Sequence, residues 1–247
     1  MIVFKRKSPK VLYITGYPRT NEGAGNIVTF KYIKEVGFDA IDVNVDYCKE
    51  KPSVILERIK RVIRENNIEL VFGLSTGGLF TACLKNINKI LINPCFNIGT
   101  FLMFQPQVPL SISLELRDLK KKIVKDDTTY GFFGTHDDVA DSKEHFIKLF
   151  GQQKCMELPS RHVPRSYEWN EFIIPKLKRI TGMKLEKIKD LEFNEPSEKK
   201  TFITIDGIRL PGLPKYFPMA IFNLRLKWLK DRGIIFKNVK IDKDKLI

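Results

Sequence analysis

The residue whose setting most strongly suggests chemistry is Ser75, in the stretch VFGLSTGG that spans residues 71–78. Gly73, Ser75 and Gly77 fit the pattern G-x-S-x-G. An apolar run precedes the pattern and the helical run GLFTACL follows it, which is the strand–turn–helix setting of a nucleophile elbow. The flanking glycines are needed there because side chains would collide with the neighbouring strand and helix. The alternative is a glycine-softened bend without chemistry, since the pattern alone occurs by chance in roughly one protein in ten.

A serine nucleophile needs a base, and the base needs an acid that orients it. The chain has three histidines, His136, His145 and His162. His145 falls inside an expected helix, DSKEHFIKLF, which predicts a surface position. His162 lies in the loop LPSRHVPRS, directly after the expected strand QKCMEL. His136 also follows an expected strand directly, so the choice of His162 as candidate base rests on strand placement together with the chain order considered next.

Two candidate acids, Asp137 and Asp138, follow the preceding expected strand YGFFG. Ser75, Asp137 and His162 then occur in the chain order Ser, Asp, His that one class of serine hydrolases uses. Adjacent side chains at a strand end point in different directions, so only one of the two acids can reach the His162 loop. Asp138 is the alternative acid, or else the cap of a helix that starts near Val139.

Two backbone N–H groups are expected to bind the oxyanion that forms when a serine attacks a carbonyl. One belongs to Thr76, the residue after the candidate nucleophile. The other is assigned to Tyr17, in the glycine-rich loop TGYPRTNEGAGN after the first strand. This loop contains neither G-x-G-x-x-G nor G-x-x-x-x-G-K-[ST], which disfavours a phosphate-binding loop.

Strand and helix patterns alternate through the first three quarters of the chain, which predicts a parallel sheet with helices on both faces. In such sheets the functional loops follow the carboxyl ends of the strands. The expected strands are residues 11–15, 41–45, 68–73, 89–94, 130–134 and 153–158. The expected helices are residues 24–36, 52–66, 78–86, 139–150 and 167–181.

Residues 95–128 interrupt this alternation and read as a long insertion between two strands. A loop of this length in a compact domain is typical of a lid or binding element. Its apolar residues 101–104, FLMF, suggest the wall of an acyl or aromatic pocket. The run LRDLKKKIVKDD, residues 116–127, predicts a short solvated helix.

From about residue 183 the pattern changes again, which predicts a small C-terminal α+β appendage. Its basic residues are compatible with a surface for nucleic acid or an acidic partner, but the favoured interpretation is an appendage that packs on the core and is solvated by its lysines. The expected order is a polar linker over 192–200, strand, turn and strand over 201–210, a loop over 211–218, a helix over 219–233 stopped by Gly233, and a strand over 234–241.

The formal net charge of +14 invites a nucleic-acid interpretation. The lysines are spread along the chain, which favours a lysine-rich surface instead.

No C-x-x-C pair occurs, so neither a zinc cluster nor any other metal site is expected, and the cysteines are interpreted as buried free thiols. No signal peptide or stretch of about 18 apolar residues is present, which predicts no membrane span and a cytoplasmic location. The four cysteines are Cys48, Cys83, Cys95 and Cys155.

Taken together, the segments around these motifs resemble the small YqiA/YcfP-like α/β-hydrolases over residues 10–180. The segments are VLYITGYPRTNEGAGN, LVFGLSTGGLFTACL, KILINPCF, YGFFGTHDDVA and LPSRHVPRSYEWNEFIIPKL. The resemblance implies Ser75 as nucleophile, Asp137 as acid and His162 as base, with Tyr17 and Thr76 at the oxyanion. It also implies hydrolysis of an ester or thioester without a cofactor.

The resulting prediction is an α/β-hydrolase domain over 1–182 and an appendage over 183–247, acting as a serine hydrolase on a small acyl ester or thioester. Thr15 stands where that family has a histidine, which together with the appendage motivates an alternative. In this alternative the fold is catalytically inactive and serves as a binding or scaffold protein, which would contact nucleic acid or an acidic partner. Neither the substrate nor the oligomeric state is readable from the sequence.

Overall fold

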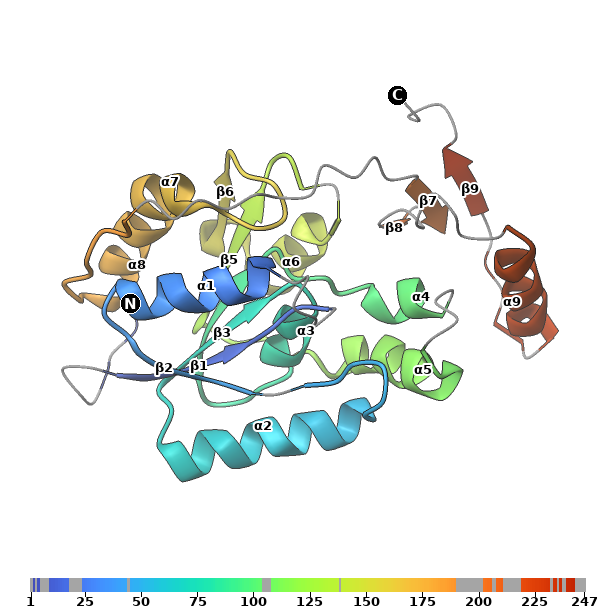
Figure 1. Ribbon diagram of the computed structural model, residues 1–247, viewed down its shortest axis with the longest axis horizontal. Helices are drawn as coiled ribbons and strands as arrows, with labels where there is room; N and C mark the ends of the chain where they lie inside the picture. The colour runs from blue at the N-terminus through green and yellow to red at the C-terminus, as the bar shows by residue number, and fades with distance from the viewer. Residues whose placement is uncertain are drawn as a thin grey trace.

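Six parallel strands form the central sheet, as predicted (Figure 1). A computed structural model describes residues 2, 4, 9–17, 24–43, 45–103, 108–137, 139–189, 202–205, 208–210, 219–231, 233–234, 236 and 239–242. The strand order is β2-β1-β3-β4-β5-β6, so the chain reverses its direction of travel across the sheet between β1 and β3. The strands are β1 (Lys10–Ile14), β2 (Asp39–Asp42), β3 (Leu70–Leu74), β4 (Asn88–Ile92), β5 (Thr129–Gly134) and β6 (Cys155–Leu158).

Helices cover both faces of this sheet, and each face has its own apolar core (Figure 1). Every residue of β3 is buried, as expected for a central strand covered on both sides. On one face lie α1 (Ala24–Glu35) and the helical segment made of α7 (Ser166–Glu168), a π-helical turn (Trp169–Ile173) and α8 (Ile174–Thr181). On the other lie α2 (Pro52–Asn66), α3 (Thr76–Ala82), α5 (Leu110–Leu119) and α6 (Lys143–Phe150).

Helix α2 has the predicted bounds because its sequence carries both end signals. Proline at its first position lacks an N–H that would have no partner there. Ile55, Leu56 and Ile59 recur at helical spacing and are buried against the sheet. The helix ends at Asn67, which adopts a left-handed conformation with φ 51° and donates its N–H to Arg64.

The insertion differs from its prediction. Its main helix is α5, whereas the charged run over 116–127 contributes only the last helical residues and a short 3-10 turn (Lys120–Lys122). Ile112, Leu116 and Leu119 are buried at helical spacing, so apolar packing and not the charged run determines where the helix lies. A shorter helix, α4 (Ile98–Leu102), precedes it.

Two other helices also depart from their predicted form for local reasons. Helix α6 begins at Lys143 and not at residue 139, because the N–H groups of Val139 and Ala140 donate to the Asp137 carboxylate. The helix predicted over 167–181 contains the π-helical turn directly before Pro175. Proline has no N–H and its ring clashes with the carbonyl four residues earlier, and a wider turn relieves that clash.

The C-terminal elements form a separate three-stranded antiparallel sheet with order β8-β7-β9. Its strands are β7 (Phe202–Ile205), β8 (Ile208–Leu210) and β9 (Val239–Asp242), and α9 (Met219–Asp231) precedes β9. Gly233, with φ 75°, follows α9 as predicted, and Ile234 donates its N–H to Leu229 of that helix. The final strand therefore begins later than predicted. The predicted linker over 192–200 and loop over 211–218 lie outside the described residues, and the domain boundary at 182 stays a prediction.

All four cysteines are free, and Cys83 and Cys95 are buried, as predicted. Cys48 and Cys155 are only partly buried. Burial raises the pKa of the Cys83 and Cys95 thiols to about 12. Among the described residues, no helix is long and apolar enough to cross a membrane, and no cluster of three or more His, Cys, Asp or Glu could hold a metal ion.

An ion pair between a fully buried lysine and a partly buried aspartate joins β4 to the loop before β5, at the amino ends of the strands. Lys89 is fully buried, and its Nζ lies 2.5 Å from Oδ2 of Asp126 and 2.8 Å from the carbonyl oxygen of Leu84. Burial lowers the pKa of Lys89. Burial alone would raise the pKa of Asp126, but hydrogen bonds from Lys89 and Thr129 outweigh it and hold that pKa below its usual value.

We expect Asp126→Asn to destabilise the fold by about 3 kcal/mol at neutral pH, because it leaves the buried Lys89 charge without a partner. Urea unfolding measures this loss. The contribution of Asp126 is complete above its unfolded-state pKa and disappears as the pH falls through the lower folded-state value. The gap between wild type and variant should therefore shrink below about pH 4.

Asp127→Asn is the matched control, because the neighbouring Asp127 also pairs with a lysine, Lys154, but has a fully exposed side chain. Exposed pairs contribute little. Equal unfolding midpoints for the two variants would contradict the assignment of the Lys89–Asp126 pair as a stabilising contact.

Candidate functional site

Ser75 occupies the turn between β3 and α3, in a backbone conformation that few residues adopt. Its φ is 53° and its ψ is −118°. Only glycine reaches this region without steric cost, so a serine here is held under strain. The residue is 5 % exposed. A strained serine between a strand and a helix is the local geometry that the G-x-S-x-G pattern predicts.

The glycines around Ser75 are required by the close approach of the backbone. A Cβ on Gly77 would collide with the carbonyl oxygen of Ile14, and one on Gly73 would collide with the Thr81 side chain. A Cβ on Gly78 would lie 2.7 Å from Cβ of Pro94. Helix α3 is therefore packed directly against the end of β1 and the residues after β4. A side chain at Gly77 or Gly78 would prevent this packing.

The end of β4 binds the backbone of Ser75 on both sides. The Ser75 N–H donates to the carbonyl oxygen of Ile92 at 3.0 Å, and the Cys95 N–H donates to the carbonyl oxygen of Ser75 at 2.9 Å. These two bonds are made by the turn that spans residues 92–95, called the β4 turn below. They hold the strained residue in place and offset part of the free energy that its conformation costs.

The loop after β1 lies against the same serine, at the point where the strand order reverses. A Cβ on Gly16 would lie 2.8 Å from Cβ of Ser75. The Gly16 N–H donates to Oδ1 of Asn26 at 2.8 Å, and Nδ2 of Asn26 donates to the Gly16 carbonyl oxygen at 3.1 Å. The N–H of Gly16 is thus bound by Asn26, and Tyr17, the predicted second oxyanion donor, is the next residue along the chain.

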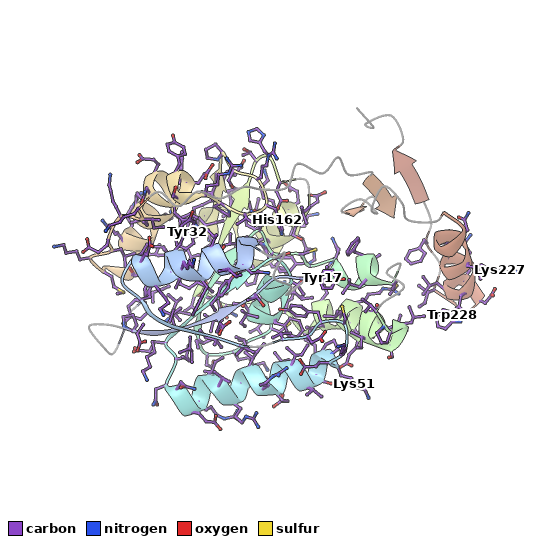
Figure 2. All side chains as sticks on the ribbon, in the orientation of Figure 1. Tyr17, Tyr32, Lys51, His162, Lys227 and Trp228 are labelled. Carbon is purple, nitrogen blue, oxygen red and sulfur yellow. The ribbon has the colours of Figure 1, made fainter. Side chains whose placement is uncertain are left out.

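Thr76, the other predicted oxyanion donor, is the first residue of α3. The first N–H groups of a helix have no acceptor inside that helix, and the helix dipole adds positive potential at this end. Figure 2 labels Tyr17, which follows β1, and His162, which follows β6. Both residues thus lie in loops after the carboxyl ends of strands.

The structure brings Asp137 and His162 together, although they are separated by 25 positions in the chain. Nδ1 of His162 lies 2.9 Å from Oδ2 and 3.0 Å from Oδ1 of Asp137. The Asp137 side chain is 4 % exposed and that of His162 is 15 % exposed. In the Nδ1–H tautomer the imidazole donates to this buried carboxylate, which leaves Nε2 to accept a proton.

The Asp137 carboxylate is itself held by backbone donors. Its Oδ1 accepts N–H groups from Val139 at 2.8 Å and Ala140 at 3.1 Å. The alternative acid, Asp138, lies outside the described residues. The helix that Asp138 was expected to cap does not begin near Val139, since α6 starts at Lys143.

Among the described residues, no hydrogen bond joins Oγ of Ser75 to the His162 imidazole. Catalytic contacts of this kind often tighten only when a substrate binds. Of the other histidines, His136 is exposed, and His145 is half-buried with its ring against Phe96. Burial lowers the pKa of His145, with Lys120 and Lys148 adding to the effect.

Sequence reasoning missed two asparagines that hold the loops of this site, Asn26 and Asn93. Asn26 binds the loop after β1, as described above. Asn93, in the β4 turn, is 1 % exposed and binds the end of β5 and the loop after β6. The signal available for Asn93 was its place between a buried strand and Pro94, where a polar side chain needs partners.

Comparison with solved structures identifies the architecture. One match is MGS-MChE2, an α/β hydrolase enzyme from the metagenome of sediments from the lagoon of Mar Chica, Morocco, with 11 % identity, a TM-score of 0.50, and coverage of 70 % of this chain and 91 % of that one. The chain has the α/β-hydrolase fold. A second match is the esterase domain of a Rhodothermus marinus protein, with 11 % identity, a TM-score of 0.50, and coverage of 70 % and 88 %. No protein-family model and no curated protein matches the sequence.

Strain at Ser75 predicts an unusual order of stabilities among variants that lack the hydroxyl. We expect Ser75→Gly to be more stable than Ser75→Ala by about 1–2 kcal/mol, because glycine adopts φ 53° and ψ −118° without a Cβ clash. Urea unfolding of both variants measures the difference.

Ser113 serves as the control, since it is a buried serine inside helix α5. There the order should be reversed, with alanine more stable than glycine by about 1 kcal/mol. If Ser75→Ala proved as stable as Ser75→Gly, the turn would not be strained as described.

Proposed function

We propose that the protein is a serine hydrolase that cleaves a small ester or thioester through Ser75, His162 and Asp137. The observation that carries the proposal is the hydrogen-bonded, largely buried pair of His162 and Asp137, in loops that follow the carboxyl ends of β6 and β5. Ser75 follows the carboxyl end of β3 in the same parallel sheet, so all three residues lie at one edge. An imidazole held by a carboxylate can activate a serine hydroxyl once that hydroxyl reaches its free nitrogen.

In the acylation step, Oγ of Ser75 attacks the carbonyl carbon and its proton passes to Nε2 of His162. The imidazolium that forms is stabilised by the Asp137 carboxylate on its other nitrogen. The carbonyl oxygen becomes an oxyanion, which the backbone N–H groups of Thr76 and Tyr17 bind. Collapse of this intermediate breaks the bond to the alcohol or thiol, and His162 returns the proton to that leaving group.

Deacylation repeats these steps with water as the nucleophile. His162 takes a proton from water, the resulting hydroxide attacks the acyl carbon, and the same N–H groups bind the second oxyanion. Collapse releases the carboxylic acid and returns the proton to Oγ of Ser75. The sequence of steps requires no metal or cofactor.

The substrate class rests on the solved structures named above and on the resemblance to the YqiA/YcfP-like α/β-hydrolases. One solved relative is described as a hydrolase and one as an esterase. Of the described residues proposed for the wall of an acyl pocket, Leu102 and Met103 are fully buried, which leaves the partly buried Phe101 as the candidate. We place the reaction in the cytoplasm.

A fluorophosphonate probe tests the proposal, because it phosphonylates only activated serines. We expect one adduct on wild type by intact mass and none on Ser75→Ala. Labelling of His162→Ala and Asp137→Asn should be slower by about 10²–10⁴-fold, because each loses general-base assistance.

Two control variants separate the site from its neighbours. His136→Ala removes an exposed histidine next to Asp137, and Asp138→Asn removes the alternative acid. Both should label at the wild-type rate. An adduct on folded wild type that persists in Ser75→Ala, or no adduct at all, would refute the proposed function. Fast labelling of Asp137→Asn together with slow labelling of Asp138→Asn would instead identify Asp138 as the acid.

A further inference from the structure

The side chain of Asn93 joins two segments that the proposed reaction needs, the end of β5 and the loop after β6. Its Oδ1 accepts the N–H of Gly134, at the end of β5, at 2.7 Å. Its Nδ2 donates to the carbonyl oxygens of His162 at 2.7 Å and Arg161 at 3.1 Å. Asn93 thus binds the backbone of the candidate base itself and the strand end three residues before the candidate acid.

These contacts require an amide. Two of them use donors and the third uses an acceptor, and among short side chains only asparagine offers both in a planar group. The residue is 1 % exposed, so each polar atom lost from it would leave a buried backbone group without a partner. A carboxylate would keep the bond from Gly134 but would place negative oxygens against the two carbonyl groups.

The backbone of Asn93 also ties the site to the nucleophile. Its N–H donates to the carbonyl oxygen of Phe132 at 2.8 Å, and its φ of 42° lies in the left-handed region. That conformation costs folding energy for any residue but glycine, although asparagine tolerates it better than most. The residues on either side of the Asn93–Pro94 pair, Ile92 and Cys95, bind the backbone of Ser75.

We propose that Asn93 is a positioning residue, which sets the place of the His162 imidazole relative to Ser75 and Asp137. The inference rests on the proposed function. The side-chain hydrogen bonds of Asn93 all go to backbone atoms, so we assign it a role that acts through His162, with no part in bond making. A displacement of about 1 Å between a base and its nucleophile lowers a rate by up to about 10²-fold.

Asn93→Gly is the test variant, because glycine accepts φ 42° and removes all three side-chain bonds without adding charge. Asn88→Gly is its matched control. Asn88 begins the same strand, β4, and its Nδ2 also donates to a backbone carbonyl, that of Glu69 at 2.9 Å, but at the opposite end of the sheet. Asn93→Asp is the second variant, since it keeps the volume and the acceptor but loses both donors.

Two measurements are made on each folded protein. The first is the maximal rate of fluorophosphonate labelling at saturating probe, kinact, together with the half-saturating concentration, KI. The second is the NMR resonance of the His162 Nδ1 proton, assigned by its loss in His162→Ala. A hydrogen bond to a buried carboxylate shifts this proton downfield and slows its exchange with water.

We expect Asn93→Gly to lower kinact by about 10–100-fold, to leave KI within about twofold, and to broaden or remove the imidazole resonance. Asn93→Asp should be at least as slow, and Asn88→Gly should match wild type in both measurements. A folded Asn93→Gly with wild-type kinact and resonance would overturn the proposal, as would failure of both Asn93 variants to fold, since the residue would then serve folding alone.

The two proposals fail in different ways. If wild type acquires no adduct, the proposed function is refuted, but the imidazole resonance still reports on Asn93. Its loss in Asn93→Gly would support the positioning role, and its retention would overturn it. If wild type labels at Ser75 and the Asn93 variants label equally fast, only the positioning role is refuted.

Discussion

The candidate site depends on the hydrogen bonds of the β4 turn. A parallel sheet brings the carboxyl ends of its strands to one edge, but it does not align the loops that follow them. Here the backbone groups of Ile92 and Cys95 bind Ser75, and the side chain of Asn93 between them binds the end of β5, three residues before Asp137, and the loop that carries His162. One four-residue turn thus makes contact with every segment to which the proposed triad belongs.

The two ends of the sheet are stabilised differently. At the amino ends, the ion pair of Lys89 and Asp126 joins β4 to the start of β5. At the carboxyl ends, Ser75 and Asn93 both adopt positive φ, which costs folding energy. Strain of this kind persists where surrounding contacts over-determine it, and proteins commonly give up stability at a functional edge while retaining it elsewhere.

Local patterns predicted the elements whose burial is periodic. The six strands, helix α2 and the turn at Ser75 follow from apolar runs, end signals and glycine spacing, and the pairing of His162 with Asp137 follows from their places after adjacent strands. The insertion's helix was predicted at the charged run over 116–127, but its buried face, with Ile112 and Leu116, places α5 mostly before that run. The roles of Asn26 and Asn93 could not be predicted, because each binds backbone groups distant in the sequence and such bonds leave no local periodicity.

The site is therefore held from two sides by two buried or partly buried amides. Asn26 fixes the loop after β1, which carries the proposed oxyanion donor Tyr17, and Asn93 fixes the end of β5 and the loop of the proposed base. Both bind main-chain atoms, so they constrain the path of each segment without contacting the side chains of Asp137 and His162. Other side chains in these loops can therefore differ, and substrate choice with them, while the backbone that places the proposed triad is kept.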